Sequence, residues 1–150
     1  MLPKLSLPEY SFNLHRKGEK LFIFDPVRKK HVRLTPEEWV RQHWIMHLHE
    51  EYHMPISHMA VEQNLRLNNM SKRADIIVYN RILQPALLVE CKAPGVTLSN
   101  SVFEQASRYN LIFKVPWLLI SNGNVHYAAF VDQAGRKTEL VHALPGYDEL

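Results

Sequence analysis

The first quarter of the chain contains a short hydrophobic run followed by turn residues. Positions 21–24 are all apolar and are typical of a strand. Asp25-Pro26 is typical of a turn, so residues 30–34 are expected to return as the second strand of a hairpin. The pattern therefore predicts a β-hairpin near the beginning of the chain.

A helix is predicted immediately after this hairpin. Thr35 can cap it, Pro36 suits its first position, and Glu38 would complete a capping box. Apolar residues recur every four positions at Val40, Trp44 and Leu48, which predicts an inward stripe. We expect the helix to run to about residue 53, because Pro55 cannot continue it.

The rest of the chain alternates strand-like segments with one more helix. A capping box at Ser101 and Glu104 predicts a helix that ends before Pro116. Strands are predicted at residues 57–67, 75–80, 86–92, 117–121, 125–131 and 138–143. This order predicts an α/β fold with a mixed sheet and few helices.

Composition narrows the class of protein. The chain has 150 residues, with 46% hydrophobic and 22% charged residues, which is typical of one globular domain at 1–150. No apolar run reaches the roughly 20 residues of a membrane span, and the beginning lacks the apolar core of a secretory signal. Cys91 is the single cysteine, so no internal disulfide is expected and a reducing cytoplasm is favoured.

Charge is unevenly distributed. Residues 1–34 hold eight basic and three acidic residues, whereas residues 35–150 hold ten basic and twelve acidic residues. A basic first segment suits a polyanion such as DNA, although a solvated surface is the alternative. The basic residues lack the neighbouring aromatics expected of a single-strand platform. Candidate DNA-binding residues in this segment are Arg28, Lys29, Lys30 and Arg33.

The chemistry is concentrated where a strongly apolar strand ends. Residues 86–89 are apolar without alternation, as in a central buried strand. Glu90 and Lys92 follow two apart and share a face, with Cys91 on the other. If residues 75–92 form a hairpin that pairs 78 with 88, or one residue off, Asp75 lies beside Glu90 or Cys91. Two carboxylates and one ammonium then converge.

Two neighbouring carboxylates repel unless a cation lies between them. Hard oxygen ligands suit Mg²⁺ or Mn²⁺, so Asp75 and Glu90 are candidate ligands. Lys92 would orient or help to deprotonate a metal-bound water. The alternative is a surface ion pair between Glu90 and Lys92 on an edge strand, which the missing alternation upstream disfavours.

This constellation resembles the PD-(D/E)xK nuclease superfamily. Asp75 is followed about fifteen residues later by Glu90-x-Lys92, and Gln105 and Tyr109 form a Q-x-x-x-Y pattern in the next helix. Ala74 replaces the proline of the motif. The similarity is greatest to the N-terminal nuclease domain of type I restriction enzyme R subunits, through residues 36–42, 73–76, 88–94, 105–110 and 121–123. The ATP-driven motor of those subunits is absent, so a stand-alone module is expected.

The resemblance implies a restriction-endonuclease-like fold, with residues 35–150 as the catalytic core and residues 1–34 as a basic hairpin segment. It implies a Mg²⁺- or Mn²⁺-dependent deoxyribonuclease, more an endonuclease than an exonuclease. Gln105 and Tyr109 would position the scissile strand, Arg108 would contact phosphate, and the Cys91 carbonyl would be a further metal ligand. DNA, restriction-modification subunits and a second copy of the chain are the implied partners.

Glu37 is a further hypothetical ligand. Related nucleases often supply a glutamate from this helix, and Glu37 has the angular position of Val40 and Trp44, so it is expected to face inward. The alternative is that Glu37 only complements the helix dipole. Glu38 is assigned to the capping box.

Two other functions are considered. The chain could be a catalytically silent module that binds DNA or a protein partner. It also contains His49-Glu50-Glu51-Tyr52-His53, which satisfies the H-E-x-x-H pattern of zinc peptidases. Pro55 follows two residues later and would fray the helix end, so solvated histidines are favoured there.

Overall fold

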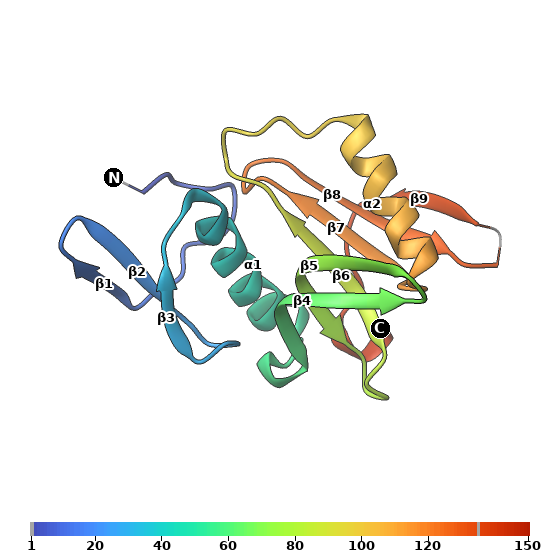
Figure 1. Cartoon of the computed structure of the whole chain (residues 1–150), viewed down its shortest axis with the longest axis horizontal. Coiled ribbons are helices and arrows are strands. Elements are labelled where there is room, and N and C mark those ends of the chain that lie inside the picture. Colours follow the sequence, from blue (N-terminus) through green and yellow to red (C-terminus); the bar gives the residue numbers. More distant parts are fainter. Residues whose placement is uncertain (1, 135) are drawn as a thin grey trace.

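The computed structural model describes residues 2–134 and 136–150, which form two sheets and two α-helices (Figure 1). A three-stranded antiparallel sheet comes first, with the order β1-β2-β3. Its strands are β1 (Leu14–Lys17), β2 (Lys20–Asp25) and β3 (Lys30–Arg33). The predicted hairpin is therefore confirmed and gains a third strand. The sequence pattern missed β1 because this strand has one apolar residue, Leu14.

Helix α1 (Pro36–Tyr52) begins and ends as predicted. The Thr35 hydroxyl accepts a hydrogen bond from the Glu38 amide at 3.0 Å, and the expected stripe of Val40, Trp44 and Leu48 is buried. The Glu38 side chain differs from the prediction. Its carboxylate bonds to buried polar side chains of α1 and to Arg28 instead of completing the capping box.

The larger sheet has six strands in the order β4-β5-β6-β7-β8-β9. They are β4 (Met59–Leu67), β5 (Met70–Tyr79), β6 (Pro85–Cys91), β7 (Trp117–Ser121), β8 (His126–Asp132) and β9 (Lys137–Val141). Only β6 and β7 pair in parallel, and helix α2 (Asn100–Ile112) connects them. Two short 3₁₀ helices complete the fold. The first, η1 (Ile56–His58), precedes β4, and the second, η2 (Tyr147–Glu149), lies near the carboxyl end of the chain.

Helices cover both faces of this sheet. Trp44 and Leu48 of α1 pack with Val89 of β6 in one cluster, whereas Ala106 of α2 packs with Leu118 of β7 in another. Neighbouring residues on a strand point to opposite faces, so the non-alternating run in β6 is explained by burial on both sides. The predicted mixed sheet flanked by helices is confirmed. In the described part of the chain, no helix has the length and apolar character needed to cross a bilayer.

Helix α2 corrects one predicted cap. The hydroxyl of Ser99, not that of Ser101, accepts a hydrogen bond from the Val102 amide at 3.3 Å, and the helix begins at Asn100. Ser101 lies inside the first turn, where its hydroxyl contacts that of Ser99 at 3.0 Å. The predicted box is shifted because two serines two residues apart are equally suitable caps on pattern alone.

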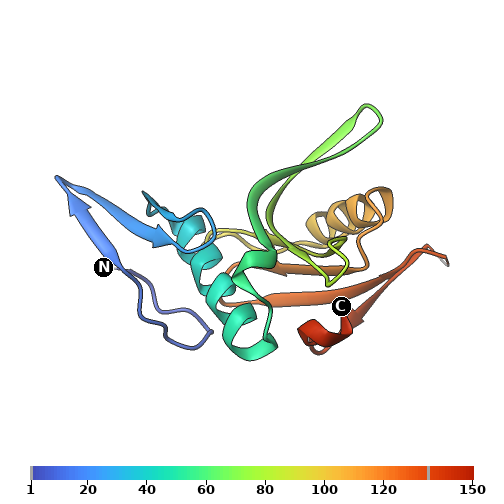
Figure 2. The same cartoon turned by 90° about the horizontal axis from the view of Figure 1, so that it is seen from below.

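The β4–β5 hairpin leaves the sheet near its middle. Strand β5 pairs with β6 only from Ile76 to Tyr79, whereas it pairs with β4 along almost its whole length. The free part of the hairpin projects away from the other strands of its sheet, and the three-stranded sheet projects on the other side of α1 (Figure 2). Asp75 is the residue at which β5 and β6 separate.

Candidate active site

Asp75 occupies the point where β5 and β6 diverge. The strands pair Val78 with Leu87 and Ile76 with Val89, one residue from the predicted pairing of 78 with 88, and this register sets Asp75 opposite Glu90. The main-chain pairing of β5 with β6 ends at Ile76. There the Asp75 carboxylate accepts a hydrogen bond from the Cys91 amide at 2.7 Å. The side chain thus replaces a main-chain partner and is held at the end of β6.

Glu90 is a buried acid at the end of a core strand, with a side chain that is 10% exposed. Its partner is Lys72 of β5, whose ammonium lies 3.1 Å from a carboxylate oxygen. Burial raises the pKa of Glu90; Lys72 lowers it and the nearby Asp75 raises it again. Asp75 thus lies close enough to Glu90 for its negative charge to disfavour the ionised form of Glu90.

Lys92 follows β6 directly and is partly buried. Its amide donates to the Ser121 carbonyl at 2.8 Å, which fixes the backbone against β7. The positive charge of Lys92 acts to lower the pKa of both Glu37 and Glu90. Its ammonium forms no ion pair within the described parts of the chain. Lys92 is thus a cation beside the acids that is not committed to any one of them.

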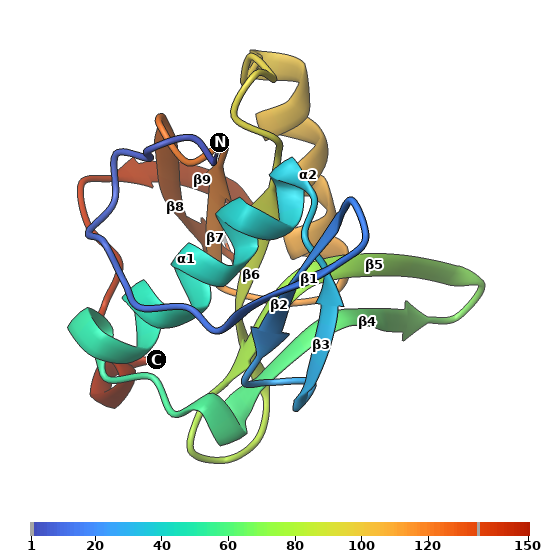
Figure 3. The same ribbon diagram turned by 90° about the vertical axis from the view of Figure 1, so that its left-hand side faces the viewer.

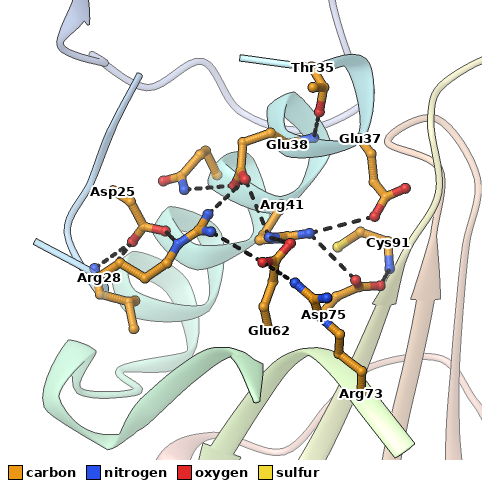
Figure 4. Close-up of polar contacts among 12 residues, drawn as sticks. Asp25, Arg28, Thr35, Glu37, Glu38, Arg41, Glu62, Arg73, Asp75 and Cys91 are labelled. Carbon is orange, nitrogen blue, oxygen red and sulfur yellow. Dashed lines mark hydrogen bonds and ion pairs between the residues drawn. The ribbon is translucent and has the colours of Figure 1, made fainter. Parts of the chain in front are cut away.

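Arg41 of α1 connects the acids around Asp75, and its side chain is only 3% exposed (Figure 4). One guanidinium nitrogen lies 3.5 Å from both Glu37 and Asp75. Another lies 3.3 Å from Glu38 and 3.1 Å from Glu62. Burial lowers the pKa of Arg41, yet Glu38 and Asp75 raise it overall, so the guanidinium stays charged and fixes their geometry.

The burial of Glu37 and Glu38 is the reverse of what the sequence suggested. Glu37 does not face inward: its side chain is 48% exposed, whereas that of Glu38 is 8% exposed. Glu38 bonds to Arg28 at 2.7 Å and to Gln42 at 3.0 Å. Glu37 nevertheless lies on the Asp75 side of α1. Its pKa is raised, mainly by burial and to a smaller extent by repulsion from the Asp75 carboxylate. The first turn of a helix projects these neighbours about 100° apart, and tertiary packing selected Glu38 for the interior.

Glu62 is a site residue that the sequence did not indicate. It stands opposite Asp75 in the β4–β5 pairing, where the ladder is interrupted between the pairs of Val61 and Gln63. Its backbone has a φ of 55°, an unfavourable conformation for a side chain with a Cβ. Arg41 and Arg73 both bond to its carboxylate and lower its pKa against the effect of burial. The sequence around Glu62 has no motif that would distinguish it from any other glutamate in a strand, so its role could not be predicted.

Gln105, Arg108 and Tyr109 lie on one exposed side of α2. With Met70 at the hairpin tip they line a groove of about 360 Å³. The Lys72 ammonium lies 5.1 Å from the centre of the Tyr109 ring and also contacts Glu90. The structure therefore links the Q-x-x-x-Y helix to the acidic site through Lys72, a residue that the motif does not include.

The basic first segment is only partly available to a ligand. Lys29, Lys30 and Arg33 are exposed, but Arg28 is not free. Its guanidinium bonds to Asp25 at 2.6 Å and to Glu38 at 2.7 Å, and its side chain is 19% exposed. These contacts leave Arg28 less available to DNA than the three exposed residues, so its predicted role in DNA binding stays a prediction. Arg28 ties the three-stranded sheet to α1, because its position in the turn faces two buried acids.

The zinc-peptidase motif is not assembled. Helix α1 ends at Tyr52, and His53 adopts a left-handed conformation with a φ of 58°. His53 therefore leaves the helical spacing that would put it on the face of His49. His49 is engaged elsewhere, because its Nδ1 lies 2.9 Å from the Met54 carbonyl.

The acids fit a hard divalent cation by their chemistry. The Asp75 carboxylate raises the pKa of both Glu37 and Glu90, and oxygen ligands of this kind suit Mg²⁺ or Mn²⁺. Within residues 2–134 and 136–150, no group of three acidic, histidine or cysteine side chains is gathered closely enough to hold an ion. Arg41 and Lys72 contact the carboxylates instead. A cation would compete with them for these oxygens.

Comparison with known proteins identifies the family of the chain and agrees with its fold. The family model described as type I restriction enzyme R protein N terminus matches residues 36–145. The chain therefore belongs to this family, as the motif resemblance predicted. The match begins at α1, so the three-stranded sheet lies outside it. A search of curated proteins finds no match.

A solved structure shares the fold. It is a fragment assigned as an HsdR subunit of a type I restriction enzyme from Vibrio vulnificus YJ016. The two align with a TM-score of 0.52 and 21% sequence identity, over 78% of this chain and 24% of that chain. This chain thus spans about a quarter of that fragment's length.

Proposed function

We propose that this chain hydrolyses DNA phosphodiester bonds in a metal-dependent reaction, in the context of type I restriction. One observation carries the proposal: Asp75 is set opposite Glu90 at the end of β6, with Glu37 and Lys92 close enough to change the local ionisation. A buried Glu90 beside further carboxylates that repel it lowers the stability of the folded state. Such arrangements cluster at functional sites.

In this proposal Asp75 and Glu90 hold one or two Mg²⁺ or Mn²⁺ ions, with the Cys91 carbonyl and Glu37 as further ligands. When bound, the ion polarises the phosphoryl oxygen and acidifies a coordinated water. Lys92 orients that water and stabilises negative charge that develops beside it. Arg41 holds Asp75 and Glu37 in place, through contacts of 3.5 Å to each.

DNA would lie across the exposed side of α2 and the basic first segment. Gln105 and Tyr109 would place the scissile strand, and Arg108, Lys29, Lys30 and Arg33 would contact phosphates. Contacts of this type confer little sequence preference, and binding falls with salt. Other restriction-modification subunits would supply site recognition, and a second copy of the chain would supply the cut in the other strand.

The decisive test compares Mn²⁺-dependent nicking of supercoiled plasmid by wild type, Lys92→Ala and Lys137→Ala. Lys137 is exposed at the beginning of β9, away from the acids, and serves as the matched control. We expect Lys92→Ala to lose activity by a factor of about 100 or more and Lys137→Ala to retain it. Equal residual nicking in all three proteins would reject catalysis by this site and favour the silent binding module.

A further inference from the structure

The three-stranded sheet has an outer face with a composition unlike the rest of the protein. Its inner face includes Ile23 and Asp25 of β2, both fully buried. Because side chains alternate along a strand, Phe22 and Phe24 lie on the opposite face. The register sets His15 and Arg33 beside Phe22, His31 beside Phe24, and Lys17 beside Lys20. We name these seven residues the outer face: His15, Lys17, Lys20, Phe22, Phe24, His31 and Arg33.

Flat rings form the middle of the outer face. The ring of Phe24 lies 5.4 Å from that of His31, and the His31 ring lies 6.0 Å from that of His15. Phe24 is 36% exposed, and both histidines are exposed. A cavity of about 520 Å³ opens beside these rings and is lined by His15, Phe22 and His31, among others. Exposed aromatic rings around an open hollow are typical of ligand-binding surfaces.

The charge of the outer face has one sign. Lys17, Lys20 and Arg33 are exposed around the rings, and none of the seven residues is acidic. Strand β1 supplies His15 and Lys17, so the surface becomes visible only once this third strand is placed. From the sequence alone, the basic residues lacked neighbouring aromatic residues. The pairing of β1, β2 and β3 shows instead that aromatic rings lie beside them. Rings and cations from three strands come together on one side.

We propose that the outer face binds single-stranded DNA, with bases stacked on Phe22, Phe24 and the two histidines and phosphates on the surrounding cations. Aromatic side chains on an exposed sheet stack unpaired bases, whereas duplex DNA hides the faces of its bases. A duplex would use the cations but not the rings. The mixture of both on one face therefore favours a single strand.

The location of the outer face supports a role of its own. The sheet lies outside the family match, which covers residues 36–145. It is nevertheless fixed to the acidic site, because Arg28 after β2 bonds to Asp25 and to Glu38 of α1. The sheet lies in front of α1 and the β4–β5 hairpin when viewed from its own side (Figure 3). DNA binding here does not depend on cleavage at Asp75.

Fluorescence anisotropy on the full chain tests the proposal without cleavage. The protein carries Lys92→Ala, EDTA is present, and the probe is labelled oligothymidylate of about 16 nucleotides, the upper end of the site size of one module. Adding Phe24→Ala and His31→Ala is expected to weaken binding by roughly ten- to a hundredfold through lost stacking. Adding Lys17→Gln and Lys20→Gln should lower the slope of log Kd against log salt by about 1.4.

Matched substitutions on β9 provide the control, because Leu140 and Lys137 are also exposed on a strand. Leu140→Ala with Lys137→Gln is expected to leave binding unchanged. Phe24→Leu keeps apolar area while removing the ring, so it separates lost stacking from misfolding, and circular dichroism checks each variant. Unchanged binding by the Phe24 and His31 variants overturns the proposal. So does equal affinity for a duplex of the same length, or tighter binding of oligouridylate.

This outcome is separate from that of the nuclease test. If the chain binds oligothymidylate through the outer face but does not nick plasmid, single-strand binding is supported and the proposed nuclease activity is rejected. If the chain nicks plasmid in a Lys92-dependent reaction but does not bind single-stranded DNA, only the proposal for the outer face is rejected.

Discussion

The Lys72 ammonium lies 3.1 Å from a carboxylate oxygen of Glu90. Lys72 belongs to the part of β5 that has left β6, and its charge also lies over the Tyr109 ring at 5.1 Å. The projecting hairpin is thus attached to the acidic site by the charge that a divalent cation would replace. If the proposed ion binds to Glu90, its binding is expected to be coupled to the position of the hairpin.

Removing that competitor should strengthen metal binding. We expect Lys72→Met to lower the Kd for Mn²⁺ at pH 8 by roughly fivefold, because a charge-assisted contact of about 1 kcal/mol no longer opposes the ion. Titration calorimetry measures the change. Arg66→Met on β4 of the same hairpin is the control, since Arg66 is exposed. Weaker binding by Lys72→Met would indicate that Lys72 supports the site instead of competing for it.

Glu90 should destabilise the metal-free protein at neutral pH. Its pKa is raised, chiefly by burial, so the folded state holds the proton more tightly than the unfolded state. Stability then falls as pH rises from the usual glutamate range through the raised pKa. We expect Glu90→Gln to remove this loss and raise the free energy of unfolding at pH 7 by roughly 0.5–2 kcal/mol.

Urea denaturation in EDTA at pH 4 and pH 7 checks this prediction, and plasmid nicking by the same variant should be abolished. Glu104→Gln, an exposed acid on α2, is expected to change neither stability nor nicking. A Glu90→Gln protein that is less stable at pH 7 would show that the Lys72 contact outweighs burial.

The core of the site was predictable because it depends on local rules. A short connection between two apolar segments fixes their register within one residue, and this alone places Asp75 opposite Glu90. Arg41 and Glu62 were not predictable. Arg41 lies on a helix face whose burial depends on α1 docking beside β5, and Glu62 becomes special only through an unusual backbone angle. Contacts between residues far apart in the chain produce no recognisable periodic pattern in a single sequence.

The corrected helix cap offers a simple stability test. Ser99→Ala removes the hydroxyl that accepts the Val102 amide and should lower the free energy of unfolding by about 1 kcal/mol. Ser101→Ala should change it by less than roughly 0.5 kcal/mol, the usual effect of a surface substitution. Thermal and urea denaturation compare the two. A larger loss from Ser101→Ala would restore the cap that the sequence pattern suggested.

Arg41 should be far more important for stability than the neighbouring Arg73. The Arg41 side chain is 3% exposed and contacts four carboxylates, whereas that of Arg73 is 62% exposed and pairs with Glu62. Removing one partner of a buried ion pair costs about 3–5 kcal/mol, but removing an exposed partner costs at most about 1 kcal/mol. We expect this difference between Arg41→Met and Arg73→Met in urea denaturation. Similar losses would mean that the carboxylates are accessible to water.

Glu62 combines a favourable charge with an unfavourable backbone, and two substitutions separate these effects. Both Glu62→Ala and Glu62→Gly remove the contacts with Arg41 and Arg73. Only glycine also relieves the positive φ of 55°, which costs a residue with a Cβ about 1 kcal/mol. The glycine variant should therefore unfold at a higher urea concentration than the alanine variant, against the usual preference of strands for alanine over glycine. If alanine is the more stable of the two, the backbone at this position is relaxed, and Glu62 acts through its carboxylate alone.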